Sequence, residues 1–220
     1  MEYKKLIFIC QYDIRQLKIM TNWTVFPDKK ILPVGFLSEK FLNLGLDRLW
    51  DACRYVHELP YGYNTDREDP LILFKEKKGS CTTKHTVIAT LAEELALPIK
   101  KTIAIYAMTE DLVTGTHAIL EKYDLPYIPM VHCFLTYRKF RIDLTEGNHN
   151  GKNHPIVDVL FTRVVKPSIS AKEEYGMYRK ALSKIILERQ ELKGLAVKRI
   201  LQARAQGLEL LKANIRTRMP

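Results

Sequence analysis

The sequence predicts an α+β fold in which one helix packs on an antiparallel sheet and a helical extension follows. Three stretches predict it. Residues 81–97 repeat apolar side chains at helical spacing, residues 130–145 alternate around a turn, and residues 166–220 hold two amphipathic helical patterns. A chain of 220 residues can bury one sizeable core. We therefore expect one domain over residues 1–165, with residues 166–220 as its helical extension.

The net charge of +10 is concentrated near the C-terminus of a chain whose composition is otherwise that of a globular protein. Residues 163–220 contain 14 lysines and arginines against 5 glutamates, whereas the preceding part is almost neutral. A basic helical segment indicates either an anionic partner or the solvated faces of packed helices. We favour packed helices and do not expect nucleic acid as a partner. The sequence leaves the oligomeric state open.

Cysteine usage and hydropathy indicate a cytoplasmic protein. The apolar run at residues 6–10 is too short for the core of a signal peptide, and no stretch approaches the length of a membrane span. We therefore expect no membrane partner. The four cysteines have no CxxC spacing, so we expect reduced thiols. They are Cys10, Cys53, Cys81 and Cys133.

The N-terminal part is expected to form two short strands, a loop and a helix. Residues 5–10 and 15–19 have the apolar character of strands, and residues 22–34 carry the prolines and charges of a loop. Residues 38–59 place an apolar stripe at helical spacing, and a proline follows the last turn. Cys53 belongs to this stripe, so we interpret it as a core residue.

An aromatic turn and a polar loop lead into the helix that organises the chain. Tyr61 and Tyr63 flank a glycine, and Ser80 is a suitable N-cap for a helix that places Cys81 in its first turn. A thiol there lies near unpaired N–H groups and the positive end of the helix dipole, which favour the thiolate. The apolar positions of this helix are Val87, Ile88, Leu91, Ala92 and Leu95, and Leu97-Pro98 ends it.

Residues 130–145 have the alternation of a β-hairpin with one apolar and one mostly polar face. With the turn centred on Arg138-Lys139, Phe134 lies opposite Asp143. His132 is then a diagonal neighbour of Asp143 on the same face, within about 7–8 Å at the backbone. A carboxylate at that distance can accept the imidazole N–H.

Weaker patterns predict the remaining elements. Before the hairpin we expect a strand at residues 99–108, a helix at 116–123 and a loop at 124–129; after it, a polar loop at 147–154 and a strand at 155–165. Two helices separated by Gly194 complete the chain. Their apolar stripes are Tyr175, Tyr178, Leu182, Ile185 and Ile186 in the first, and Val197, Ile200, Leu201, Leu208, Leu211 and Ile215 in the second.

Cys81, His132 and Asp143 together form the set required for acyl transfer by a thiol. Cys81 is the candidate nucleophile, His132 the base and Asp143 the carboxylate that orients the base. His85, one helical turn after Cys81, is the rival base. A metal site formed by Cys81, His85, His132 and Cys133 is the alternative, but neighbouring strand residues 132 and 133 should face opposite ways.

At these residues the sequence resembles the transglutaminase-like superfamily, whose catalytic core has a papain-like fold. The resemblance covers about residues 42–148 and rests on Gly79-Ser80-Cys81 before a helix, Val131-His132-Cys133-Phe134 and Ile142-Asp143-Leu144-Thr145. The chain departs from many members in having Thr82-Thr83-Lys84-His85 after the cysteine and leucine in place of the proline of Asp-Pro-Thr. The resemblance implies a catalytic triad of Cys81, His132 and Asp143.

The expected function is cleavage or transfer at an amide carbonyl of a peptide or protein. The Cys81 backbone N–H should contribute to an oxyanion hole, with Tyr61 or Tyr63 as the second donor. Water as acceptor would make a cysteine protease or amidase, and an amine would make a transglutaminase. We expect no cofactor and no metal. The alternative is a non-catalytic interaction protein that uses the same fold and docks an anionic partner on its basic helices.

Overall fold

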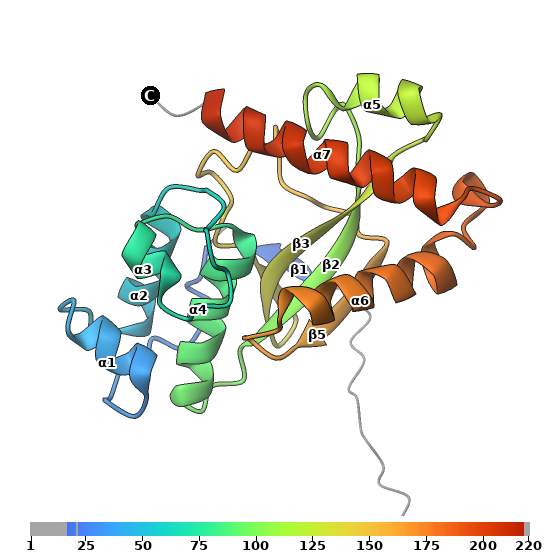
Figure 1. Ribbon diagram of the computed structural model, residues 1–220. Coiled ribbons are helices and arrows are strands. Elements are labelled where there is room, and N and C mark those ends of the chain that lie inside the picture. The colour runs from blue at the N-terminus through green and yellow to red at the C-terminus, as the bar shows by residue number, and fades with distance from the viewer. Residues whose placement is uncertain (1–16, 21, 218–220) are drawn as a thin grey trace, which may run out of the picture.

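The computed structural model describes residues 17–20 and 22–217, which form an α+β fold around a five-stranded sheet (Figure 1). The predicted strand at residues 5–10, with Cys10, lies outside the described residues. The strands follow the order β1-β4-β3-β2-β5 across the sheet. They are β1 (Lys18–Met20), β2 (Lys100–Met108), β3 (Ile128–Tyr137), β4 (Phe140–Ile142) and β5 (Phe161–Val165).

The sheet is mixed, so the expectation of a wholly antiparallel sheet is wrong. Strand β1 pairs with β4 in parallel, whereas β3 pairs with both β2 and β4 antiparallel and β2 pairs with β5 antiparallel. A hairpin forces its two strands to be antiparallel, but β1 and β4 are joined through most of the chain, which allows either direction. The expected strand at residues 155–165 is also shorter, and β3 begins inside the expected loop at 124–129.

The predicted register of the β3–β4 hairpin is confirmed. Leu135 pairs with Ile142 and Tyr137 with Phe140, so the turn is centred on Arg138-Lys139. The predicted polar face is nevertheless buried, because helix α7 (Val197–Thr217) packs against β3 on that side. Met108 and Met130 lie against Gly207 of this helix, where a Cβ would be 2.7 Å from the Met108 methyl carbon.

The single helix expected over residues 38–59 is two helices, α1 (Phe36–Leu42) and α2 (Leu49–Glu58). Gly45, at φ +77°, turns the chain between them. The Glu94 carboxylate accepts the backbone N–H groups of Leu37 and Ser38 at 3.0 and 2.7 Å, which anchors the start of α1. The apolar stripe of α2, including Cys53, is buried as expected.

Helix α4 (Cys81–Glu94) is the predicted helix that begins at Cys81, and it packs against α1, α2, β2 and β3. The short helix α3 (Ile72–Glu76) precedes it. Lys84 of α4 is buried, and its Nζ donates to the carbonyl oxygens of His57 and Leu59 at the C-terminal end of α2. These contacts fix the two helices to each other, and burial lowers the pKa of Lys84 to about 7.

The C-terminal helices belong to a second apolar cluster that they share with β2, β3 and α5 (Thr116–Tyr123), the helix expected at these residues. Figure 1 shows α1 to α4 grouped at one side of the sheet and α5 to α7 at the other. Helix α6 (Ala171–Ala181) continues as a π-turn, and Gly194, at φ +86°, separates it from α7 as predicted. Two residues of its expected apolar stripe are exposed: Tyr175 and Ile185.

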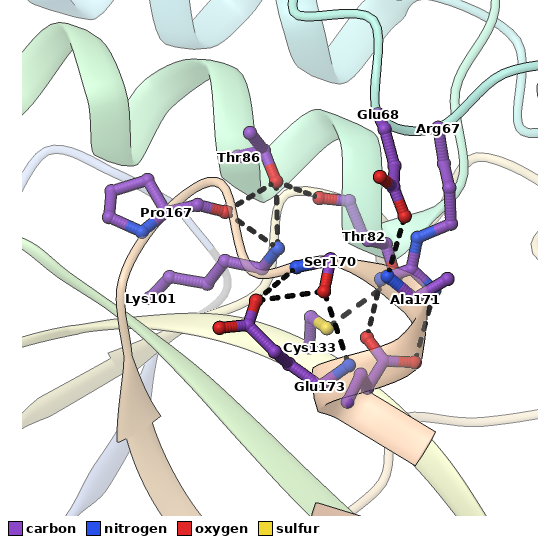
Figure 2. A network of polar contacts seen from close by, with 11 residues as sticks. Arg67, Glu68, Thr82, Thr86, Lys101, Cys133, Pro167, Ser170, Ala171 and Glu173 are labelled. Carbon is purple, nitrogen blue, oxygen red and sulfur yellow. Dashed lines mark hydrogen bonds and ion pairs between the residues drawn. The ribbon is translucent and has the colours of Figure 1, made fainter. Parts of the chain in front are cut away.

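A polar network fixes the chain before α6 to the body of the protein (Figure 2). Lys101 of β2 is buried, and its Nζ donates to Thr86 Oγ1 at 2.7 Å and to the Pro167 carbonyl at 3.1 Å. Arg67 binds the Glu174 carboxylate of α6 through two hydrogen bonds, of 3.1 and 2.7 Å. Strand β2, helix α4 and helix α6 are therefore held together by buried charges as well as by apolar packing.

Within the described ranges, residues 17–20 and 22–217, no helix combines the length and apolar character needed to cross a membrane.

Replacing Tyr178 tests whether α6 belongs to the cooperative core. Tyr178 is fully buried and its hydroxyl donates to the Pro129 carbonyl at 3.0 Å, so Tyr178→Ala should lower the free energy of unfolding by about 3–5 kcal/mol. The matched control is Tyr175→Ala on the same helix, at a residue 43% exposed, which should cost less than about 1 kcal/mol. Urea denaturation measures both. Equally small effects would place α6 outside the cooperative core.

Candidate active site

Cys81 is the first residue of α4, with Ser80 as the N-cap residue, as predicted. Ser80 has extended backbone angles, and its side chain makes no capping hydrogen bond. The chain just before the helix pairs with the aromatic turn through a bridge between Gly79 and Tyr61. A Cβ at Gly79 would lie 2.9 Å from Thr83 Oγ1, so only glycine allows this close approach.

His132 of β3 and Asp143, which follows β4, are joined by a hydrogen bond between His132 Nε2 and Asp143 Oδ2. Both side chains are buried. The other carboxylate oxygen, Oδ1, accepts the backbone N–H of Thr145 at 2.8 Å and its hydroxyl at 2.7 Å. Asp143 is therefore held on both oxygens, and it fixes the orientation of the His132 ring.

The structure brings Cys81 and His132 together in the wall of one cavity of about 210 Å³. The two side chains lie close enough for the charge of His132 to lower the pKa of Cys81. Since Asp143 occupies Nε2, the nitrogen that remains for Cys81 is Nδ1. The three residues of the predicted triad therefore lie together. Cys81 is 8% exposed, so the reacting atom reaches solvent only through this cavity.

Hydrogen bonding and charge make Cys81 and His132 an ion pair. A hydrogen bond from Cys133 and the positive charge of His132 hold the pKa of Cys81 well below its usual value, although burial opposes them. Burial lowers the pKa of His132, but the negative charges of Asp143 and Cys81 outweigh it and raise that pKa to about 9. At neutral pH the site therefore holds a thiolate beside an imidazolium.

His85, the rival base, is placed where it cannot accept a proton from Cys81. Its ring is fully buried, and its Nε2 accepts the Leu144 backbone N–H at 2.8 Å. That nitrogen is also 3.4 Å from Asp143 Oδ1. Burial lowers the pKa of His85 to about 4, so the ring is neutral at pH 7. His85 thus supports the turn that carries Asp143 and does not line the cavity.

Cys133 lies beside Cys81, which corrects the expectation that strand alternation separates residue 133 from the site. It shares a small buried cluster with Cys81, and its sulfur lies 3.6 Å from Thr82 Oγ1. The proposed metal set with His85 is nevertheless not assembled. Among described residues, the cluster with metal-binding geometry is His132, Asp143 and Glu146, whose ligand atoms lie within 4.8 Å of one another. In this cluster His132 Nε2 is already bonded to Asp143.

Tyr61 and Tyr63, the expected oxyanion donors, both line the cavity. Their rings meet edge to face, with centroids 6.3 Å apart. Tyr61 and Cys81 belong to the same small buried cluster, against which Tyr63 packs as a partly buried residue. Burial and the neighbouring Cys81 charge raise the pKa of both hydroxyls, so each keeps its proton at neutral pH. Tyr61 is therefore the better placed of the two as a donor.

The cavity also contains residues that sequence reasoning did not single out. Helix α7, interpreted as part of an extension, supplies one wall, and the polar loop after the hairpin supplies another. The polar and cationic residues among them gave no signal, because such residues usually lie on solvated faces, and the two leucines were expected only as part of an apolar stripe. These residues are Asn150, Lys152, Arg204, Leu208 and Leu211.

Searches of protein-family models, curated proteins and solved structures find no match to this chain.

The lowered pKa of Cys81 predicts selective reactivity below neutral pH. Iodoacetamide should alkylate Cys81 ahead of Cys53 and Cys133. As the pH is lowered, the rate at Cys81 should begin to fall only far below about 8.5, the pKa of a free thiol. Peptide mass mapping across pH 4–10 measures the rate at each cysteine. A midpoint near 8.5 would show that Cys81 is an ordinary thiol.

A matched pair of substitutions identifies the histidine on which this reactivity depends. His132→Gln removes the imidazolium and should slow alkylation of Cys81 at pH 6 by at least about tenfold. His85→Gln keeps an acceptor for the Leu144 N–H and should change that rate by less than about twofold. Thermal unfolding of both variants controls for folding. The opposite ranking would assign the base to His85.

Proposed function

We propose that the protein catalyses cysteine-dependent reaction at an amide carbonyl, with Cys81, His132 and Asp143 as the catalytic triad. The observation that carries the proposal is the hydrogen-bonded pair of His132 and Asp143 beside Cys81, with Cys81 and His132 in the wall of one cavity. A nucleophile, a base and an orienting group in hydrogen-bond contact are the elements of thiol acyl transfer.

In the first half of the reaction the Cys81 thiolate attacks the carbonyl carbon. The oxyanion that forms accepts hydrogen bonds from the Cys81 backbone N–H and from the Tyr61 hydroxyl, which lines the same cavity as Cys81. His132, protonated at neutral pH, gives its proton to the leaving amine as the C–N bond breaks. The products of this half are a free amine and a thioester on Cys81.

In the second half neutral His132 takes a proton from the acceptor while the acceptor attacks the thioester. Water releases a carboxylic acid, whereas a primary amine releases a new amide; either restores the Cys81 thiolate and protonated His132. Asp143 stays ionised in both halves, since the charge of His132 when protonated, the hydrogen bond from its ring and the charge of Lys152 hold the Asp143 pKa well below the usual value against the effect of burial.

The transglutaminase-like superfamily with its papain-like core is part of the same proposal. Its support is the order of the parts along the chain: a helix that begins at Cys81, then a strand with His132, then Asp143 directly after the returning strand. After Cys81 the chain departs from many members of the superfamily, and three of the residues concerned are buried: Thr83, Lys84 and His85. Each of them makes a hydrogen bond that supports a neighbouring loop or helix.

A second candidate is a non-catalytic interaction protein of the same fold. The low exposure of Cys81 favours it, because a covered thiol does not meet a large substrate. Against it, the cavity beside Cys81 has a volume of about 210 Å³, which is large enough for a substrate side chain. This is the volume of about seven water molecules of roughly 30 Å³ each. Measuring turnover of an amide substrate distinguishes the two candidates, because only the enzyme forms product.

We expect turnover of peptide amides with a bell-shaped dependence on pH. The thiolate requires a pH above the lowered pKa of Cys81, and the proton given to the leaving amine requires a pH below about 9, the raised pKa of His132. Mass spectrometry of a glutamine- and glutamate-containing peptide library, with and without a fluorescent primary amine, distinguishes cleavage from amine incorporation. Cys81→Ala should abolish both. Product formation that survives in Cys81→Ala, or no product with selectively reactive Cys81, would reject the proposal.

A further inference from the structure

Besides the His132 imidazolium, which is balanced by the Cys81 thiolate, the cavity is lined by three lysine or arginine side chains and, among the described residues, one carboxylate. The cations are Arg67, Lys152 and Arg204, and the carboxylate is Glu174. Arg67 is neutralised by Glu174, which it binds through two hydrogen bonds of 3.1 and 2.7 Å. Lys152 and Arg204 therefore decide the charge that the cavity presents to a ligand.

Lys152 serves the catalytic groups. It is buried, with its Nζ 5.8 Å from the centroid of the Tyr61 ring. Its positive charge helps to lower the pKa of Cys81 and of Asp143. Lys152 thus offsets negative charge that the site already contains.

Arg204 of α7, by contrast, is not balanced by an anionic group among the described residues. Its guanidinium lies 4.6 Å from the centroid of the Tyr178 ring, and its Nε is buried without a hydrogen-bond partner. In the described part of the chain no carboxylate forms an ion pair with it. A partly buried cation that stacks on an aromatic face with its Nε unpaired has lost part of its hydration without gaining an anionic partner. Such an arrangement is costly for folding alone, and it is accounted for when a ligand supplies the anion.

The position of Arg204 relates it to the reacting sulfur. The hydroxyl groups of Tyr63 and Tyr106 both experience the charge of Arg204 and the charge of Cys81, which act on their pKa values in opposite directions. Both tyrosines line the cavity. Arg204 and Cys81 therefore act across the same small space, with the two rings beside them.

From this geometry we infer that Arg204 binds a carboxylate of the substrate, so that the preferred acyl group carries an acidic side chain next to the reacting carbonyl. The inference rests on the proposed function of Cys81 and names its substrate class. A planar guanidinium fork matches a carboxylate through two parallel hydrogen bonds. Arg204 would be a specificity residue, which acts on binding and leaves the chemistry to the triad.

A matched pair of affinity labels tests the inference on the intact protein without requiring turnover. The chloromethyl ketones of N-acetyl-glutamic acid and N-acetyl-glutamine carry the side chain on the acyl side and differ only in a carboxylate against a carboxamide. Each forms a thioether with Cys81 as chloride leaves. We expect the glutamate label to react faster by about tenfold, the gain from one charge-assisted contact. Rates are measured by mass mapping at pH 6.5.

Arg204→Gln should reduce the ratio of the two rates to near one, and Arg204→Lys, which keeps the charge without the fork, should leave an intermediate ratio. The control is Lys198→Gln, an exposed residue of the same helix, which should keep the wild-type ratio. Circular dichroism confirms folding of each variant, and Arg204→Lys alone decides the matter if Arg204→Gln fails to fold.

The outcomes separate this inference from the function on which it rests. A selectively reactive Cys81 with equal rates for both labels, or a ratio that Arg204→Gln leaves unchanged, would overturn the role of Arg204 and leave the triad in place. Cys81 unreactive toward both labels would overturn the proposed function itself. A label with phosphoserine in place of glutamate that reacts faster still would replace the carboxylate by a phosphate.

Discussion

The hydrogen bond between His132 and Asp143 is the interaction on which the rest of the candidate site depends. A buried carboxylate is costly unless it is paired and hydrogen-bonded. Asp143 meets that condition through His132 on one oxygen and Thr145 on the other. The same pairing keeps His132 protonated beside Cys81, so one buried contact sets both the geometry and the charge of the thiol.

Helix α4 brings Cys81 to this pair, and the rigidity of its position comes from polar contacts at its first two turns. Lys84 fastens the helix to the end of α2, and His85 accepts the N–H of Leu144 in the turn after Asp143. Neither residue needs a role in chemistry. They ensure that the helix start and the hairpin end move together, which preserves the distance between nucleophile and base.

The C-terminal helices close the site from the other side and give it the charge that a substrate would meet. Helix α6 supplies Glu174, which neutralises Arg67, and α7 supplies Arg204 and two leucines of the cavity wall. The basic side chains of this segment lie in two different environments. Most of its charged side chains lie on solvated faces, whereas Arg204 turns into the protein, so net charge alone describes the segment poorly.

The sequence alone was sufficient to predict the start of α4 at Cys81 and the register of the hairpin, since helical periodicity and a period of two depend on neighbours in the chain. From these, the meeting of His132 with Asp143 follows. Only tertiary structure decided the break at Gly45, the parallel pairing of β1, the burial of the hairpin's polar face, and the places of Cys133 and Arg204. These features depend on contacts between segments far apart in the chain, where local periodicity carries no information. A helical arginine on a polar stripe has the same pattern whether solvent or a cavity lies opposite it.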